Sequence, residues 1–262
     1  MNFYGKTILI TGASSGIGKA MAKKLAGENL NLILVARRIN LLEEIKSETA
    51  GRKCELLLLQ CDVSKKNDVA AAFKTIKNNF RQVDLAILNA AVTHNMNVLN
   101  YNSDFAEKIY GTNLFGIIYW IEQLLPDFIE QGNGIIAGVS SMADNRGYSG
   151  SRFYSSSKAA VTNYLEGLRT ELFSYGVKVI SIRPGFVETP MTNGNKYKMP
   201  FLMTAEKAAE IILDGIKKEK RVIQFPWQMA LITSIIGLLP DCLYESMAGL
   251  QYKNKTERKK SL

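Results

Sequence analysis

Short apolar runs that predict β-strands alternate along the chain with segments whose apolar residues recur at helical spacing. The apolar runs cover residues 6–11, 31–36, 55–59, 85–88, 134–139, 178–182 and 222–225. The helical segments cover residues 16–29, 41–47, 69–79, 104–129, 153–175 and 205–218. Strands that alternate with helices are joined by right-handed crossovers, which make the strands parallel and place helices on both faces. The pattern therefore predicts an α/β fold with a doubly wound parallel sheet of about seven strands.

The chain carries no internal repeat and no linker rich in proline or serine, so we expect a single domain over residues 1–262. Its one irregular insertion, residues 190–204, follows the sixth strand. Open α/β sheets place ligand lids at this edge, where the strands end. We therefore expect residues 190–204 to form a lid.

The segment 222–240 is uncharged and lies between Arg221 and Asp241. Pro226 and Pro240 confine a helix there to about 13 residues, or roughly 20 Å, which is shorter than a hydrocarbon core of about 30 Å. We therefore expect a buried or interfacial helix over residues 227–239. It either packs tightly against the body or another subunit, or rests against a bilayer surface.

The composition, with 47% hydrophobic and 22% charged residues, excludes a disordered, collagen-like or disulfide-rich chain. Part of the net charge of +9 lies in a basic tail, residues 251–262, which has five basic residues and one acidic residue, Glu257. We expect a solvated, frayed end there, with attraction to anionic lipid as the alternative, and no nucleic-acid binding.

Cysteine and histidine usage gives no sign of a metal site. Cys54, Cys61 and Cys242 form no CxxC pair, and the chain has one histidine. We expect no metal and a reducing, cytoplasmic setting, with peripheral membrane contact left open.

The turn between the first strand and the first helix reads Thr-Gly-Ala-Ser-Ser-Gly-Ile-Gly, residues 11–18. Glycines at 12, 16 and 18 permit a tight turn and a close approach of backbone N–H groups to a pyrophosphate at the helix N-terminus. The order of strand, turn and helix is the context that this motif requires. We expect the turn to bind a dinucleotide through Gly12, Ser14, Ser15, Gly16, Ile17 and Gly18.

The end of the second strand distinguishes NAD from NADP. An acidic residue there would bind the ribose 2′-hydroxyl of NAD, but the sequence has Arg37 and Arg38. The guanidinium of Arg37 suits a 2′-phosphate, so we expect NADP(H).

Tyr154 has a lysine, Lys158, four residues later, and these positions share one face of a helix. A phenol is a poor base at neutral pH, but a nearby ammonium favours the phenolate and lowers the pKa of such a phenol. A tyrosine in this setting can protonate the alkoxide that forms as a carbonyl accepts a hydride.

Six motifs stand in order between residues 6 and 192: the glycine turn, Asn89-Ala90-Ala91, Asn113, Ser141 thirteen residues before Tyr154, Tyr-Ser-Ser-Ser-Lys, and Pro184-Gly185. Together they resemble the short-chain dehydrogenase/reductase family. The resemblance implies a Rossmann-type fold, an enzyme, and a homo-oligomer, dimer or tetramer, paired through the two long helices. Alanine at position 91, where the family more often has glycine, is a small departure that should leave the backbone contacts intact.

The resemblance also implies residue roles. Ser141 would hold the substrate oxygen, Tyr154 would act as general acid/base, Lys158 would bind the nicotinamide ribose, and Asn113 would support a water-linked proton path. Ser140 is the alternative serine, but the thirteen-residue offset favours Ser141. Further cofactor contacts would come from Asp62, Val63, Asn89, Ala90, Ala91, Tyr154, Lys158, Pro184, Gly185, Val187 and Thr189.

The sequence thus predicts an NADP(H)-dependent oxidoreductase that interconverts a ketone or aldehyde with an alcohol. The alternative is a dinucleotide-sensing binding protein without turnover. Apolar residues in the lid, Met191, Met199, Phe201, Leu202 and Met203, favour a lipophilic substrate or simply cover a core. Three more residues are weaker candidates for the pocket wall: His94, Tyr148 and Phe153.

Overall fold

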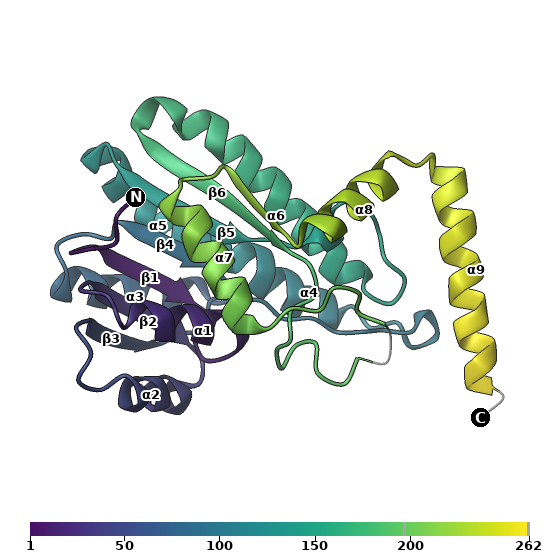
Figure 1. The fold of residues 1–262 in the computed structure, drawn as a ribbon, viewed down its shortest axis with the longest axis horizontal. Coiled ribbons are helices and arrows are strands. Elements are labelled where there is room, and N and C mark those ends of the chain that lie inside the picture. Colours follow the sequence, from purple (N-terminus) through teal and green to yellow (C-terminus); the bar gives the residue numbers. More distant parts are fainter. Residues whose placement is uncertain (196–197, 261–262) are drawn as a thin grey trace.

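The computed structural model describes residues 1–195 and 198–260, with side chains described as far as Leu250. Within these residues one parallel sheet has the strand order β3-β2-β1-β4-β5-β6-β7 (Figure 1). Its strands are β1 (Thr7–Thr11), β2 (Asn31–Ala36), β3 (Glu55–Gln60), β4 (Leu85–Leu88), β5 (Gly134–Val139), β6 (Val177–Pro184) and β7 (Val222–Phe225). The sheet confirms the predicted Rossmann-type, doubly wound fold.

Helices cover both faces of the sheet and bury two separate apolar cores. One face is covered by α1 (Gly16–Leu25), α2 (Ile39–Glu48) and α7 (Ala205–Lys217). The other face is covered by α3 (Lys66–Asn79), α5 (Gly116–Gln131) and α6 (Arg152–Glu171). A strand between two such layers must be apolar on both sides, which explains the continuous apolar run of β2.

The strand order reverses beside β1. The chain runs from β1 outward through β2 and β3, and then returns so that β4 pairs with the other side of β1, with Ile8 opposite Leu85. The loops that follow β1 and β4 therefore leave the sheet in opposite directions. Doubly wound sheets bind ligands in the crevice that this divergence opens at the carboxyl ends of the strands.

The long helix predicted over residues 104–129 is interrupted. It consists of α4 (Asp104–Tyr110), a π-helical turn (Gly111–Phe115) and α5. At Gly116 the helix passes so close to the loop after β3 that a Cβ would lie 2.9 Å from Cγ2 of Val63. The wide π-turn places Asn113, which is fully buried, beneath the cleft described below.

The C-terminal region differs from the prediction in two respects (Figure 1). The expected frayed tail is helical as far as Lys260, within α9 (Asp241–Lys260), which extends away from the sheet. The preceding helix α8 (Trp227–Leu238) has only Thr233 buried, so, of the alternatives left open for it, tight packing against the body is not what the structure has. Among the described residues no single helix is long and apolar enough to span a bilayer. The length and composition of α8 and Asp241–Leu250 together would suffice, but these two helices are bent by 117° relative to each other.

Candidate active site

A cleft of about 230 Å³ lies at the carboxyl ends of the strands. It gathers residues from the glycine turn, the ends of β2 to β6, and helix α6, which are far apart in sequence. The predicted site residues that line it are Gly12, Ser14, Ser15, Gly16, Ile17, Arg37, Asp62, Val63, Asn89, Ala90, Ala91, Ser141, Tyr154, Lys158, Pro184, Gly185, Val187 and Thr189.

The three glycine positions of the turn leave no room for a side chain. At Gly12 (φ +66°) a Cβ would lie 2.8 Å from the Cα of Ala90, and at Gly16 (φ +53°) it would lie 2.8 Å from Cγ2 of Thr189. A Cβ on Gly18, which does not line the cleft, would lie 2.7 Å from Nδ2 of Asn89. The bare backbone beside the N-terminus of α1 forms a cradle that fits the pyrophosphate of a dinucleotide.

The loop after β4 is fastened to this turn by Asn89 and Thr11. The amide Nδ2 of Asn89 donates to the carbonyls of Thr11 and Gly12, at 3.1 and 3.3 Å. The hydroxyl of Thr11 accepts hydrogen bonds from the backbone N–H groups of Asn89 and Ala90, at 3.0 and 3.1 Å. These contacts hold the two sides of the crevice at a fixed separation.

Two arginines line the cleft at the end of β2. The guanidinium of Arg38, which the sequence analysis left without a role, donates to the hydroxyls of Ser14 and Ser15, at 3.2 and 3.4 Å. The adjacent Arg37 also faces a shallow hollow along β3 and α3. Asp62 lines the cleft as well, but its Oδ1 accepts hydrogen bonds from the N–H and hydroxyl of Ser64.

Lys158 is buried beneath the cleft with 1% of its surface exposed. Its Nζ donates to the carbonyl of Val139 at 2.7 Å and lies 5.8 Å from the ring centroid of Tyr154. Burial lowers the pKa of Lys158 to about 7, and the negative charge of Asp144 opposes that shift. The pair on α6 therefore has the predicted proximity, with the cation embedded and the phenol on the cleft wall.

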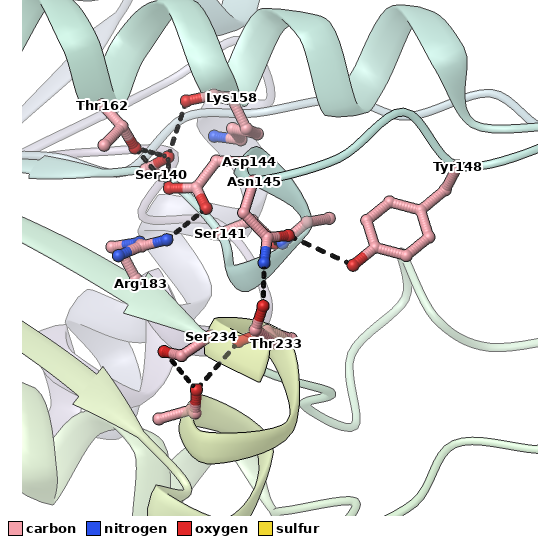
Figure 2. Close-up of polar contacts among 12 residues, drawn as sticks. Ser140, Ser141, Asp144, Asn145, Tyr148, Lys158, Thr162, Arg183, Thr233 and Ser234 are labelled. Atoms are coloured by element: carbon pink, nitrogen blue, oxygen red, sulfur yellow. Dashed lines mark hydrogen bonds and ion pairs between the residues drawn. The ribbon is translucent and has the colours of Figure 1, made fainter. Parts of the chain in front are cut away.

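The two serines after β5 have different surroundings (Figure 2). The hydroxyl of Ser140 is buried, where it donates to the carbonyl of Lys158 at 2.8 Å and contacts Oγ1 of Thr162 at 2.6 Å. Ser141 is half-buried on the cleft wall, and its Oγ accepts from the N–H of Ala143 at 3.1 Å. An oxygen that accepts one bond in this way can still donate its proton to a substrate.

Asn113 does not line the cleft but braces it from behind. Its Oδ1 accepts from the N–H of Val92 at 2.8 Å, and its Nδ2 donates to the carbonyl of Val92 and to Oγ of Ser157, each at 3.0 Å. The π-turn is thereby tied to the loop after β4 and to α6. Thr112, its neighbour in that turn, lines the cleft instead.

A buried carboxylate stands behind the serines (Figure 2). The side chain of Asp144 is 1% exposed, pairs with Nη2 of Arg183 on β6, and accepts a hydrogen bond from Thr162 on α6. Ser140 adds a longer contact at 3.4 Å. The cluster joins β5, β6 and α6 directly under the cleft. The sequence analysis missed it, because the partners lie 18 and 39 residues from Asp144 and no local spacing connects them.

The weaker candidates for the pocket wall lie elsewhere. His94 stacks on Phe105 at 3.7 Å, Phe153 packs edge-on against Tyr101, and the hydroxyl of Tyr148 donates to Asn145. Among the apolar lid residues that the structure describes, Met191 alone contributes to the cleft lining. Part of the predicted lid, residues 196–197, lies outside the described residues.

Cys61 lines the cleft, but burial raises the pKa of its thiol to about 12. A thiol that stays protonated at neutral pH is a poor nucleophile. In the described part of the chain, no three His, Cys, Asp or Glu side chains stand close enough together to hold a metal ion.

Comparison with known proteins agrees with this geometry. The profile of the short chain dehydrogenase family matches residues 6–199. An uncharacterized oxidoreductase of Myxococcus xanthus is 32% identical over 93% of this chain and 96% of its own length. An NADP-dependent 3-hydroxy acid dehydrogenase of Schizosaccharomyces pombe is 33% identical over 84% of this chain and 90% of its own.

Solved structures have a similar fold. An alcohol dehydrogenase from Thermococcus sibiricus, in complex with 5-hydroxy-NADP, has a TM-score of 0.73 at 27% identity, with 84% of this chain and 94% of that chain covered. The match of the family profile to most of the chain, together with full-length relatives, settles the assignment. The chain belongs to the short-chain dehydrogenase family, oxidoreductases that bind a nicotinamide dinucleotide and act on CH–OH and C=O groups.

Proposed function

We propose that the protein reduces a ketone or aldehyde to an alcohol with NADPH, and that Tyr154 supplies the proton. The observation that carries this proposal is the convergence of Ser141, Tyr154 and Lys158 on the cleft that also contains the glycine turn. We favour reduction of a carbonyl over oxidation of an alcohol because cells usually hold NADP(H) in its reduced form.

The roles follow from the positions of the side chains. When bound, the reduced dinucleotide supplies a hydride to the carbonyl carbon. The hydroxyls of Ser141 and Tyr154 donate hydrogen bonds to the carbonyl oxygen, and these bonds strengthen as that oxygen gains negative charge. Tyr154 then transfers its proton to the oxygen, and the nearby ammonium of Lys158 stabilises the phenolate that remains.

Positioning comes from residues behind the cleft. The hydrogen bond from Lys158 to the Val139 carbonyl fixes the ammonium against α6, and the carboxylate of Asp144 favours its charged form. Asn113, as a positioning residue, is hydrogen-bonded to Val92 on the cleft wall and to the buried Ser157 on α6. Because Asn113 is buried, it would support a proton path and would not touch the substrate directly.

The test of the catalytic role is Tyr154→Phe, which keeps the ring and removes the proton. We expect turnover of a carbonyl substrate to fall by about 10²- to 10⁴-fold, the usual contribution of a general acid, while NADPH binding measured by fluorescence is unchanged. Tyr148→Phe is the matched control, since that hydroxyl bonds Asn145 outside the cleft lining. Turnover that survives in Tyr154→Phe would contradict the proposal.

The preference for NADP(H) rests on Arg37 and Arg38. Both line the cleft, and Arg38 already contacts the hydroxyls of Ser14 and Ser15. A charge-assisted bond of about 1.5–3 kcal/mol to a 2′-phosphate corresponds to roughly a 10- to 100-fold change in affinity. We expect Arg37→Leu and Arg38→Leu each to raise the KM for NADPH by that factor and to leave the KM for NADH unchanged. An equal effect on both dinucleotides would refute the assignment.

We also propose that the substrate is lipophilic and that subunits pair through the long helices. Val92, Val187 and Met191 give the cleft apolar walls, which support a lipophilic substrate.

The aromatic Phe115 and the aliphatic Ile129 are exposed at the two ends of α5, and they support pairing of subunits through the long helices.

A further inference from the structure

Helix α8 presents an uncovered apolar face, which we call the α8 stripe. It consists of Trp227, Leu231, Ile235 and Leu238, with exposed fractions of 70%, 56%, 54% and 85%. Their spacing of four, four and three residues places them on one side of the helix. The whole segment 222–240 is without charge, so no charged side chain interrupts the stripe.

The opposite side of α8 is fastened to the body, so the stripe has a fixed orientation. Asn145 donates to the carbonyl of Thr233 (Figure 2), and Arg146 donates to the carbonyls of Ile236 and Gly237, at 3.3 and 3.1 Å. Arg146 also pairs with Asp241, at the start of α9. These contacts satisfy the last carbonyls of α8 and hold the stripe facing outward.

Helix α9 begins with exposed apolar residues and ends in a segment with a basic sequence. Leu243, Met247 and Leu250 follow at helical spacing, with exposed fractions of 53%, 65% and 62%. Beyond them the helix continues to Lys260 through a stretch in which the sequence has five basic residues and Glu257. Along the chain, exposed apolar residues that include a tryptophan are therefore followed by a basic segment.

We propose that α8 and α9 bind the surface of a bilayer that contains anionic lipid. Apolar side chains with a tryptophan suit the boundary between headgroups and acyl chains, and lysine and arginine are attracted to anionic headgroups. A second copy is a poorer partner, because an identical chain also has a net charge of +9 and offers no excess negative charge to the basic segment. Anionic lipid neutralises that charge instead.

The position of the stripe fits this role. Helix α8 begins two residues after β7 ends, at the edge of the sheet where the cleft opens, and it is hydrogen-bonded to the loop that follows Ser141. The cleft and the lipid-binding surface therefore lie at one edge of the molecule. Binding to vesicles is measured without substrate, so this inference stands or falls separately from the catalytic proposal.

The two tryptophans make a direct test possible. Trp227 is 70% exposed, whereas Trp120 is completely buried and serves as an internal reference. With vesicles of phosphatidylcholine and phosphatidylglycerol in equal parts, we expect the protein to sediment with the lipid and its emission to shift to the blue. Brominated acyl chains should quench this emission, and Trp227→Phe should remove the quenching without preventing sedimentation.

Three variants of the full chain identify the surface. Ile235→Glu with Leu238→Glu should abolish sedimentation, whereas Tyr4→Glu, at an exposed position before β1, should leave it unchanged. Lys253→Gln, Lys255→Gln, Lys259→Gln and Lys260→Gln together should remove the preference for phosphatidylglycerol over phosphatidylcholine alone. Turnover of a water-soluble substrate should be the same in all of them.

Two results would overturn the inference. One is a wild-type protein that does not sediment with vesicles containing phosphatidylglycerol. The other is a native oligomer that dissociates in Ile235→Glu with Leu238→Glu while lipid binding persists, because the stripe would then be a contact between subunits.

Discussion

A lysine with 1% of its surface exposed is unusual, because burial disfavours its charged form. Lys158 tolerates this position through its hydrogen bond to Val139 and through the nearby carboxylate of Asp144, and its pKa still falls to about 7. Burial of this kind is characteristic of functional sites, where a pKa is moved toward neutral pH. The same burial has a cost in stability that depends on pH.

That cost can be measured with Lys158→Met. Above about pH 7 the folded protein releases the proton of Lys158, whereas the unfolded chain keeps it up to the ordinary value of 10.5. Because the unfolded state then binds more protons, raising the pH over this range stabilises the wild type. We expect the free energy of unfolding of the wild type, relative to Lys158→Met, to rise from pH 7 toward pH 10. Urea unfolding at several pH values checks this, and a difference independent of pH would contradict the low pKa.

At the scale of elements, the junction between β5 and α6 carries the most functional contacts. Ser141 lines the cleft there, Asp144 connects the junction to β6 and α6, and Asn145 and Arg146 hold α8. A short loop between a strand and a helix thus sets the position of the proposed oxygen-binding serine and of the C-terminal helices. The geometry of the site depends on this loop more than on the lid.

Asp144→Asn should separate positioning from simple stability. Removing this carboxylate leaves Arg183 without its ion-pair partner, which typically costs about 3–5 kcal/mol in a buried pair. We expect turnover to fall by about 10²-fold as well, the scale of a misplacement near 1 Å. The matched control is Asp84→Asn, which removes a carboxylate that is 5% exposed and paired with Lys6 at the opposite edge of the sheet.

The control variant should lose stability while its turnover is unchanged. Comparable losses of turnover in Asp144→Asn and Asp84→Asn, with folding verified by circular dichroism, would show that Asp144 contributes only to stability.

At the scale of the whole molecule, one sheet separates two cores that share its strands. Ile33 and Leu34 are neighbours on β2 and are both completely buried, but Ile33 belongs to the core under α3, α5 and α6 and Leu34 to the core under α1, α2 and α7. Since β1 to β6 contribute to both cores, loss of one core should destabilise the other. This arrangement supports the proposal of a single domain.

Ile33→Ala and Leu34→Ala test that cooperativity. Each should lower the free energy of unfolding by about 2–5 kcal/mol, as truncation of a buried aliphatic side chain usually does. Both should shift the same single transition, followed by far-ultraviolet circular dichroism and by the fluorescence of buried Trp120. Two separate transitions in either variant would indicate domains that unfold independently.

The alternation of apolar runs and helical segments was enough to predict the sheet, because the apolar periodicity of each strand and helix is visible within a few residues. Strands β2, β4, β5 and β7 have the predicted limits, and the glycine turn stands between β1 and α1 as its motif requires. The spacing of Tyr154 and Lys158 likewise predicted their proximity, since four residues on a helix make one turn.

Features that depend on residues far apart in sequence were decided by the tertiary structure. The ion pair of Asp144 with Arg183, the reach of Arg38 to the glycine turn and the π-turn around Asn113 all arise where separate elements meet. Local patterns record which face of an element is apolar, but not what covers it. The sequence therefore determined that α8 is an apolar helix, and only the packing of the whole chain left its stripe facing outward.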